Sequence, residues 1–228
     1  MPPLGGQQPA INCPQCGAPA PFRGTALSLV CEYCGSTVVR TGADVELVGK
    51  ISALIDNGSP ILLGSSGGFD DVKFEVIGRL QIRYARGTWN EWYLEFARGE
   101  NGWLSDAQGS FAVTKRQTSF TVGRKKRTHT PTFPKLTVGQ KIHISGAPMI
   151  ITDKRAAQYV GSEGCLPFDT RKEQTYYSVD LRDAWGGFMT LDFGTSGEHG
   201  NPALYVGRAV SLAEIELRPL RKYEGWRV

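Results

Sequence analysis

Val72–Tyr84 reads VKFEVIGRLQIRY, and this stretch decides the fold class. Apolar residues occupy every second position on both sides of Gly78. They are Val72, Phe74 and Val76 before the glycine, and Leu80, Ile82 and Tyr84 after it. Such alternation predicts β structure, and the glycine inside it predicts either two strands or one bent strand. Trp89–Phe96 (WNEWYLEF) continues the pattern, so we expect a mainly β protein.

The same rhythm continues through residues 60–228, which we expect to form one antiparallel β domain. Short alternating runs separated by glycines lie at residues 102–105, 110–113, 142–144, 149–152, 176–181, 188–193, 204–207 and 213–217. The runs fall into two loosely similar halves, 60–120 and 138–220, which permits an internal duplication. Ser211 and Glu214 fit a capping box, so a short helix over 211–216 competes with the last strand.

The first 57 residues have a different character. Residues 1–12 (MPPLGGQQPAIN) are rich in proline and glycine, and we expect a disordered tail. Residues 43–57 place apolar side chains on one helical face, which predicts an amphipathic linker helix. These side chains are Leu47, Val48, Ile51, Leu54 and Ile55. Asn57-Gly58-Ser59-Pro60 would end this helix.

The cysteines carry the clearest chemical signal. Cys13, Cys16, Cys31 and Cys34 form two Cys-x-x-Cys pairs, each followed by a glycine that permits a tight turn. Two such pairs on a short hairpin predict a zinc ribbon over residues 13–40, with four thiolates around one ion. The zinc is expected to be structural because four protein ligands leave no open position, and iron is the less favoured ion. Removing the metal should unfold residues 13–39 and leave the β domain folded.

The charge is unevenly distributed. The net charge of +4 arises from 26 basic and 22 acidic residues, yet residues 107–152 contain eight Lys or Arg and no Asp or Glu. Four of these eight lie together at Arg124, Lys125, Lys126 and Arg127, in an expected loop. This loop could contact phosphates of nucleic acid or anionic lipid head groups, or it could be a solvated connector.

Three further side chains suggest a pocket or a partner surface in the β domain, namely Trp89, Glu91 and Asp180. Cys165 could be a nucleophile, although a lone cysteine is more often a small buried hydrophobe. The chain has only three His, which excludes most multi-histidine metal and catalytic schemes. No stretch of about 20 apolar residues is present, so no transmembrane segment is expected.

Six stretches of the β domain resemble bacterial proteins of the domain of unknown function 4178 family, which is often found behind a small zinc ribbon. The stretches are Phe74–Arg79, Trp89–Leu94, Gly102–Leu104, Gly164–Phe168, Val179–Leu181 and Leu204–Gly207. The family carries an acidic residue where Cys165 stands. The resemblance implies an accessory role near the membrane, in a bacterial envelope-stress or polyamine-linked system.

These observations favour a non-enzymatic, soluble adaptor that binds another protein, and this partner could be membrane-associated. We expect it in the cytoplasm, or peripheral to the inner membrane face. The first alternative is a nucleic-acid-binding protein that uses the zinc ribbon and the basic loop. The second alternative is a small-ligand binder or enzyme with a pocket in the β domain, which the absence of an evident acid–base constellation makes the weakest of the three.

Overall fold

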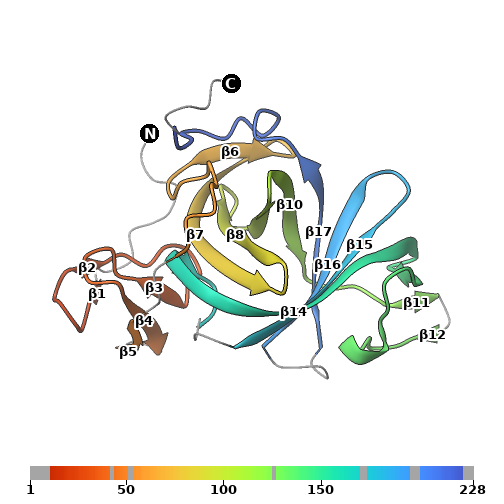
Figure 1. The fold of residues 1–228 in the computed structure, drawn as a ribbon, viewed down its shortest axis with the longest axis horizontal. Coiled ribbons are helices and arrows are strands. Elements are labelled where there is room, and N and C mark those ends of the chain that lie inside the picture. The colour runs from red at the N-terminus through yellow and green to blue at the C-terminus, as the bar shows by residue number, and fades with distance from the viewer. Residues whose placement is uncertain are drawn as a thin grey trace.

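The protein is described by a computed structural model (Figure 1), which covers residues 11–41, 44–50, 54–124, 127–169, 174–195 and 201–222. The described chain is mainly β, as the alternating sequence predicts. Its only described helical element is the 3-10 turn η1, Phe133–Lys135, so no described helix is long enough to span a membrane.

Eight antiparallel strands close into a barrel. Each half contributes a four-stranded meander, and the two meanders meet where β7 pairs with β14 and where β10 pairs with β17. The first meander is β7 (Val72–Tyr84), β8 (Gly87–Phe96), β9 (Asn101–Ala107) and β10 (Ser110–Gln117). The second is β14 (Ala147–Leu166), β15 (Thr175–Arg182), β16 (Gly187–Gly194) and β17 (Ala203–Val210). The two similar halves predicted from the sequence are therefore two halves of one barrel.

The stretch that decides the fold is one bent strand. The register of β7 against β8 shifts between Val76 and Gly78, which is a β-bulge, and Gly78 lies opposite Gly164 of β14. The backbones approach so closely here that a Cβ on Gly78 would lie 1.9 Å from the carbonyl oxygen of Cys165. Glycine is therefore required where the first meander meets the second.

The outer faces of both meanders are covered by further chain. Phe74, Trp92 and Leu94 pack beneath β6 (Ser66–Phe69) and the C-terminal segment that contains Ile215 and Leu217. On the other half, residues 120–144 cover a second apolar core through Phe133, Ile142 and their neighbours. These residues include β13 (Lys141–Ile144), β11 (Gly123–Arg124) and β12 (Arg127–Thr128). The covered outer face of the first meander also carries a buried polar network, in which Arg79 lies over the Trp92 ring and donates hydrogen bonds to Asn90, which in turn donates to Asp106. Polar side chains therefore occupy part of this outer face as well as the barrel interior.

The cysteine-rich segment extends the same sheet. Its strands are β1 (Ile11–Asn12), β2 (Pro19–Ala20), β3 (Ser28–Val30), β4 (Ser36–Thr41) and β5 (Asp44–Lys50). β3, β4 and β5 continue the barrel sheet, whereas β1 and β2 pair in a small sheet of their own. β3 pairs with the end of β14 (Cys165 opposite Leu29), and buried side chains of the segment share one core with the barrel interior. Figure 1 shows β1–β5 on one side of the barrel and β11–β12 on the opposite side.

A loop of the ribbon closes one end of the barrel. Along β8, the residues that alternate inward are Trp89, Glu91, Tyr93 and Glu95. Arg23 pairs with both Glu75 and Glu95 at the bottom of this row. Asn101, beside the β8–β9 turn, donates a hydrogen bond to the Thr25 hydroxyl at 2.9 Å. We call this the closed end, and the end with the β7–β8 and β9–β10 turns the open end.

Three local predictions were wrong or fall partly outside the described residues. The predicted linker helix over 43–57 is wrong, because residues 44–50 form β5 on the free edge of β4, and residues 54–57 have no regular structure. Pairing with an available edge outweighs a helical apolar period, particularly for the β-branched Val45 and Val48. Residues 51–53 lie outside the described residues, as do 1–10 of the expected disordered tail, whereas Ile11 and Asn12 pair in β1.

The predicted last strand over 213–217 is also wrong. Residues 212–216 form turns, and Ser211 and Glu214 make the reciprocal hydrogen bonds of a capping box without a helix after them. Glu216 has a positive φ of 51°, which ends the turn before a helix can grow. Ile215 and Leu217 remain buried against the outer face of the first meander.

Candidate functional site

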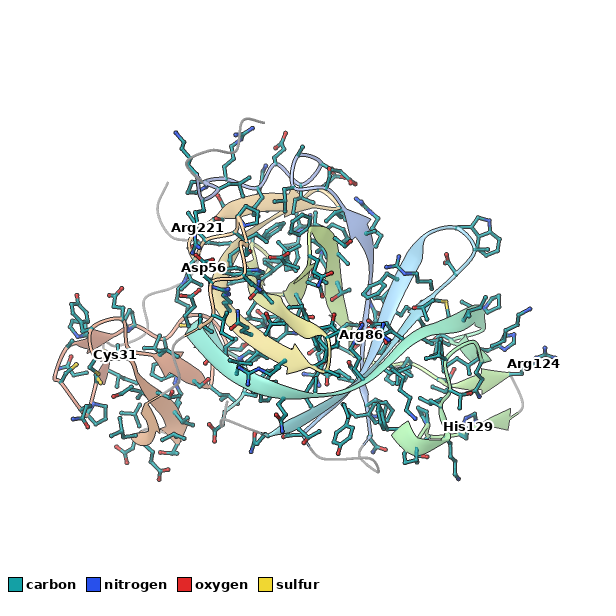
Figure 2. All side chains as sticks on the ribbon, in the orientation of Figure 1. Cys31, Asp56, Arg86, Arg124, His129 and Arg221 are labelled. Atoms are coloured by element: carbon teal, nitrogen blue, oxygen red, sulfur yellow. The ribbon has the colours of Figure 1, made fainter. Side chains whose placement is uncertain are left out.

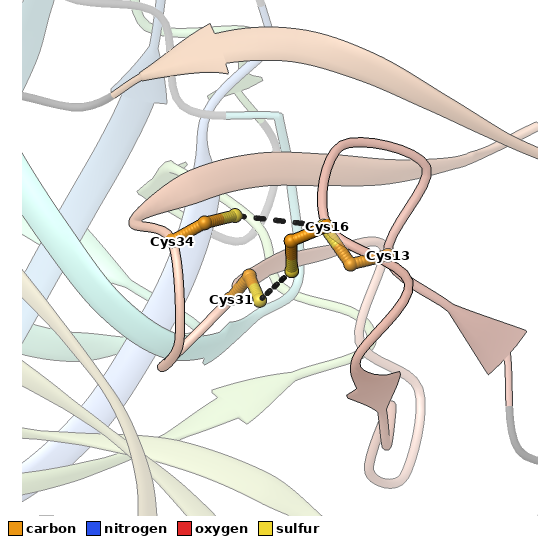
Figure 3. Close-up of side chains that lie close together, drawn as sticks. All are labelled: Cys13, Cys16, Cys31 and Cys34. Atoms are coloured by element: carbon orange, nitrogen blue, oxygen red, sulfur yellow. Dashed lines mark hydrogen bonds between the residues drawn. The ribbon is translucent and has the colours of Figure 1, made fainter.

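The four cysteines of the ribbon converge on one point (Figure 3). Their sulfur atoms all lie within 4.8 Å of one another, with Sγ–Sγ distances of 3.7 Å for Cys13–Cys34 and for Cys16–Cys31. Gly17 and Gly35 adopt positive φ, and their N–H groups donate to the carbonyl oxygens of Cys13 and Cys31 at 2.8 Å. Each pair therefore forms the tight knuckle that the following glycine predicts.

The donor set fits a tetrahedral metal ion. Metal–sulfur bonds of about 2.3 Å in a regular tetrahedron place the sulfurs about 3.8 Å apart, and the two 3.7 Å distances match this closely. The thiols titrate as a coupled group: hydrogen bonds from Ser36 lower the pKa of Cys34 to about 6, whereas desolvation and the neighbouring thiols raise the pKa of Cys16 to about 12. The site can hold a metal ion with four thiolate ligands, and it leaves no position for a substrate.

A second site lies inside the open end of the barrel. A cavity of about 550 Å³ is lined by inward-facing side chains from strands of both meanders. Exposed residues of the β9–β10 turn, Gln108 and Gly109, lie at its rim, and buried Leu80, Ile82 and Trp103 lie deeper. This volume is within the range of pockets that hold small organic molecules.

Four carboxylates line this cavity. Asp153 pairs with Arg155, and we call the other three the carboxylate cluster: Glu91 of β8, Asp180 of β15 and Asp192 of β16. Glu91 accepts hydrogen bonds from Trp89 Nε1 (2.8 Å) and Ser105 Oγ (2.7 Å). Asp180 accepts one from Thr190 Oγ1 (2.8 Å), and Asp192 accepts one from the Gly194 N–H (2.7 Å). Within the described ranges, no Lys, Arg or His lies within 4.0 Å of a carboxylate of the cluster.

Enclosure of the cluster shifts its titration towards neutrality. Desolvation raises the pKa of Glu91 to about 7, although the hydrogen bonds from Ser105 and Trp89 oppose it. Desolvation likewise raises the pKa of Asp180 and of Asp192 to about 6. The negative charges of Asp180 and Asp192 add to the shift at Glu91, so the cluster is electrostatically coupled across the cavity. All three side chains are half-buried because the cavity itself exposes part of their surface.

Arg155 lies at the rim of the cavity. Its guanidinium carbon lies 4.2 Å from the centre of the Tyr84 ring and 5.5 Å from that of Trp89, and it pairs with Asp153 two residues earlier. These aromatic residues come from β7 and β8, whereas Arg155 comes from β14. A planar cation is thus already bound between aromatic faces and a carboxylate at the rim.

Aromatic side chains form much of the remaining wall. Trp103 packs against Tyr93 and Phe168, with ring centroids 4.9 Å and 5.9 Å apart. Burial raises the pKa of Tyr176 and Tyr205 above the ordinary value of a tyrosine, so both phenols stay neutral at physiological pH. Tyr176 donates a hydrogen bond towards Asp192. The cavity therefore combines neutral aromatic surface with acidic groups.

The structure brings together the three pocket residues singled out in the sequence, because Trp89, Glu91 and Asp180 all line this cavity. Sequence reasoning missed Asp192 and Arg155. Asp180 and Asp192 each stand between two apolar residues in a strand (Val-Asp-Leu and Leu-Asp-Phe), and that repeated pattern was the available signal.

The other predicted residues lie elsewhere. Figure 2 shows Arg124 and His129 on the side of the molecule opposite Cys31, so the basic loop and the ribbon do not share a face. Arg124 is exposed, whereas Lys125, Lys126 and the Arg127 side chain lie outside the described residues. Cys165 is buried with its Sγ 3.7 Å from the Pro21 carbonyl oxygen, and burial raises the pKa of its thiol. This environment suits a small packed side chain.

Comparison with known proteins adds one finding. A family model described as Domain of unknown function (DUF4178) matches residues 62–212, about two thirds of the chain. The match contains every strand of the barrel and both walls of the cavity, and it stops short of the four cysteines. No curated protein and no solved structure matches the chain.

Proposed function

The chain belongs to the DUF4178 family, and from the geometry of its barrel we propose that it binds a small organic molecule in the cavity at the open end. The observation that carries this proposal is the cavity of about 550 Å³ with the carboxylate cluster on its walls. Eight-stranded barrels are just wide enough to be filled by side chains or to hold one small ligand. The volume left open here supports the second use.

The destabilisation caused by burying the carboxylate cluster supports the same proposal. Burying carboxylates without a cationic partner destabilises a fold, and their raised pKa values measure that cost. Apolar residues at these positions would give a more stable barrel. Polar groups that converge on a cavity at the expense of stability are characteristic of binding and active sites. Binding is the simpler function, because the ring of side chains contains no evident nucleophile–base pair.

We assign the ribbon a structural role in this function. Four thiolates in tetrahedral array favour zinc, with iron as the less favoured ion. The metal would hold the loop that contains Arg23 and Thr25 against the closed end of the barrel. The ribbon would then act as a plug, and ligand would enter and leave only at the open end.

The proposal is tested by asking whether the barrel retains a molecule during purification. The protein is purified under native conditions and denatured, and the released small molecules are identified by mass spectrometry. Ala112→Phe is the test variant, because Ala112 lines the cavity and a phenyl ring would fill part of it. Ala156→Phe is the matched control, because Ala156 is exposed and lies on the outer face opposite Tyr177.

We expect one molecule to accompany wild type and Ala156→Phe and to be lost from Ala112→Phe. A molecule retained equally by all three proteins would bind elsewhere and would contradict the proposal. The absence of any retained molecule, together with no thermal stabilisation of wild type over Ala112→Phe by a panel of small amines, acids and neutral compounds, would also contradict it.

The adaptor role predicted from the sequence is a second candidate, supported by two exposed aromatic side chains. Tyr33 on the second cysteine knuckle is 68% exposed, and Trp185 in the β15–β16 turn is 83% exposed. Exposed aromatics of this kind anchor protein interfaces. Capture of one defined partner that is lost with Tyr33→Ser or Trp185→Ser, and kept with Ala112→Phe, would support this candidate. Capture that survives both serine substitutions would exclude these surfaces.

A further inference from the structure

We propose that the barrel cavity selects an organic cation with a planar, delocalised charge, such as a guanidinium or an amidinium compound. This inference rests on the proposed function, because it names the class of molecule that the cavity takes. It follows from the distribution of charge in the cavity and from the way in which the protein binds one of its own cations.

The charge of the cavity wall is negative. The lining contains four carboxylates (Glu91, Asp153, Asp180 and Asp192) and two guanidinium groups (Arg155 and Arg182). Asp153 is paired with Arg155, and Arg182 stacks on the ring of Phe188 with its charge 5.0 Å from the ring centre. Neither arginine lies within ion-pair distance of the carboxylate cluster. The cluster therefore leaves a negative interior that a ligand of opposite charge can neutralise.

The cluster surrounds the cavity from opposite walls. Glu91 lies on β8 of the first meander, and Asp180 and Asp192 lie on β15 and β16 of the second. In the pairing of β15 with β16, Asp192 lies opposite Ser178. Asp180, two residues after Ser178, is therefore the diagonal neighbour of Asp192 on the same face of the sheet. A small cation in the cavity would be near carboxylates on both sides, and each contact would become stronger because solvent is displaced.

Arg155 shows which shape of cation this environment accommodates. Its planar guanidinium lies over Tyr84 and close to Trp89, while Asp153 accepts its Nε–H hydrogen bond. Aromatic faces and a carboxylate are the two partners that stabilise a delocalised cation. The same two kinds of group continue inward from the rim, as Trp103, Tyr176 and the carboxylate cluster. Deeper in the cavity, a ligand cation would therefore contact the same two kinds of group that Arg155 contacts at the rim, namely aromatic faces and carboxylates.

Other ligand classes fit the cavity less well. An anion would be repelled by the carboxylate cluster. Of the two guanidinium groups in the lining, that of Arg155 is already paired with Asp153, and that of Arg182 belongs to an exposed residue and lies over Phe188. A neutral aromatic molecule could pack against Trp103 and Phe168, but it would leave the buried charges without a partner. Charge therefore separates the three classes, and shape alone does not.

The experiment compares three probes that share a shape and differ in charge: benzamidine, benzamide and benzoate. Binding to the full-length, metal-loaded protein is measured by isothermal titration calorimetry in low salt near pH 8. We expect benzamidine to bind at least about tenfold more tightly than benzamide, and benzoate to bind most weakly. Asp192→Asn should weaken benzamidine about tenfold and leave benzamide unchanged. Glu100→Gln, which neutralises an exposed carboxylate paired with Lys115, is the control and should change neither.

Each outcome decides between the inference and the function beneath it. If benzamide binds as tightly as benzamidine and Ala112→Phe abolishes both, the cavity binds ligands but the cation preference is overturned. If Asp192→Asn weakens both probes equally, the residue is structural and the inference is also overturned. If none of the probes binds, the inference is overturned, and the retained-molecule experiment decides the proposed function by itself. A retained molecule that carries no positive charge would likewise overturn the inference.

Discussion

Glu91→Gln should stabilise the folded protein in a pH-dependent way. Glutamine has nearly the same size as glutamate, and its amide oxygen can accept the hydrogen bond from Trp89 Nε1. Its NH2 group can donate to Ser105 Oγ, which donates to Glu91 in the wild type. The substitution therefore preserves packing and local hydrogen bonds and removes one titratable charge from the cavity.

The expected magnitude follows from the pKa. The pKa of Glu91 rises from its ordinary 4.5 to about 7 in the folded protein, chiefly through desolvation. Between these pH values the folded state holds a proton that the unfolded state has released, so the free energy of unfolding falls as pH rises. At 1.36 kcal/mol for each pH unit, the whole interval is worth about 3.4 kcal/mol, and the part above pH 5.5 about 2 kcal/mol. Water in the cavity screens the charge, so we expect about 1–2 kcal/mol.

The measurement is urea denaturation of wild type and Glu91→Gln near pH 5.5 and near pH 8.5. The free energy of unfolding of the variant relative to wild type should be higher by about 1–2 kcal/mol at the alkaline pH than at the acid pH. Because Asp180 and Asp192 are coupled to Glu91, the difference reports the response of the carboxylate cluster and not of Glu91 alone. Other charged groups face the same cavity in both proteins. They are Asp153, Arg155, Asp180, Arg182 and Asp192. The same effect of Glu91→Gln at both pH values would refute the desolvated, charged cavity, and Glu100→Gln should show no pH-dependent gain.

Three further predictions follow from the same architecture. The sequence alone predicts that metal removal leaves the β domain unaffected, but the ribbon and the barrel share one core. Metal chelation or Cys31→Ser should therefore lower the urea midpoint of the barrel as well as of the ribbon, read by near-UV circular dichroism. An unchanged barrel midpoint would contradict this coupling. Gly78→Ala should destabilise the protein by about 2–3 kcal/mol or prevent folding, because the new Cβ would lie 1.9 Å from the Cys165 carbonyl oxygen. A loss of less than about 1 kcal/mol in the free energy of unfolding, measured by urea denaturation, would argue against this close approach. Benzamidine should bind more tightly near pH 8 than near pH 5.5, as measured by calorimetry. The pKa of Glu91 is about 7 and those of Asp180 and Asp192 are about 6, so the carboxylate cluster gains negative charge over this interval. Equal affinity at both pH values would contradict a role for the cluster.

The strands could be predicted from the sequence because alternation is a local property. Val72–Tyr84 shows both the period of two and the glycine at which the strand bends, and the structure has one bent strand there. The predicted linker helix was wrong. Residues 44–50 form a strand because they pair as a hairpin with β4, which ends at Thr41, and this pairing outweighs the helical period of the apolar residues.

The cavity could be predicted only in part, because alternation does not tell which face of a strand is inside. In Leu-Asp192-Phe the aspartate lies opposite two apolar residues, and the ordinary interpretation places it in solvent. Here residues 120–144 cover the apolar face from outside, and barrel closure turns the acidic face inward. Glu91 could be singled out in the sequence because it stands between Trp89 and Trp92. Arg155 carries no such local signal, because its partners Tyr84 and Trp89 come from the other meander.

The ribbon and the cavity are connected through stability. A barrel that keeps about 550 Å³ open and holds three half-buried carboxylates with raised pKa values gives up packing and electrostatic energy at its open end. The ribbon stabilises the closed end through the pairing of β3 with β14, the contacts of Arg23 with Glu75 and Glu95, and a common apolar core. A metal ion bound by the four thiolates would hold this segment folded, since its own core is small. A metal ion that contacts no ligand can therefore still be required for a binding site at the other end of the barrel. The stability that it gives the ribbon would offset the destabilisation caused by the buried carboxylates and the open cavity.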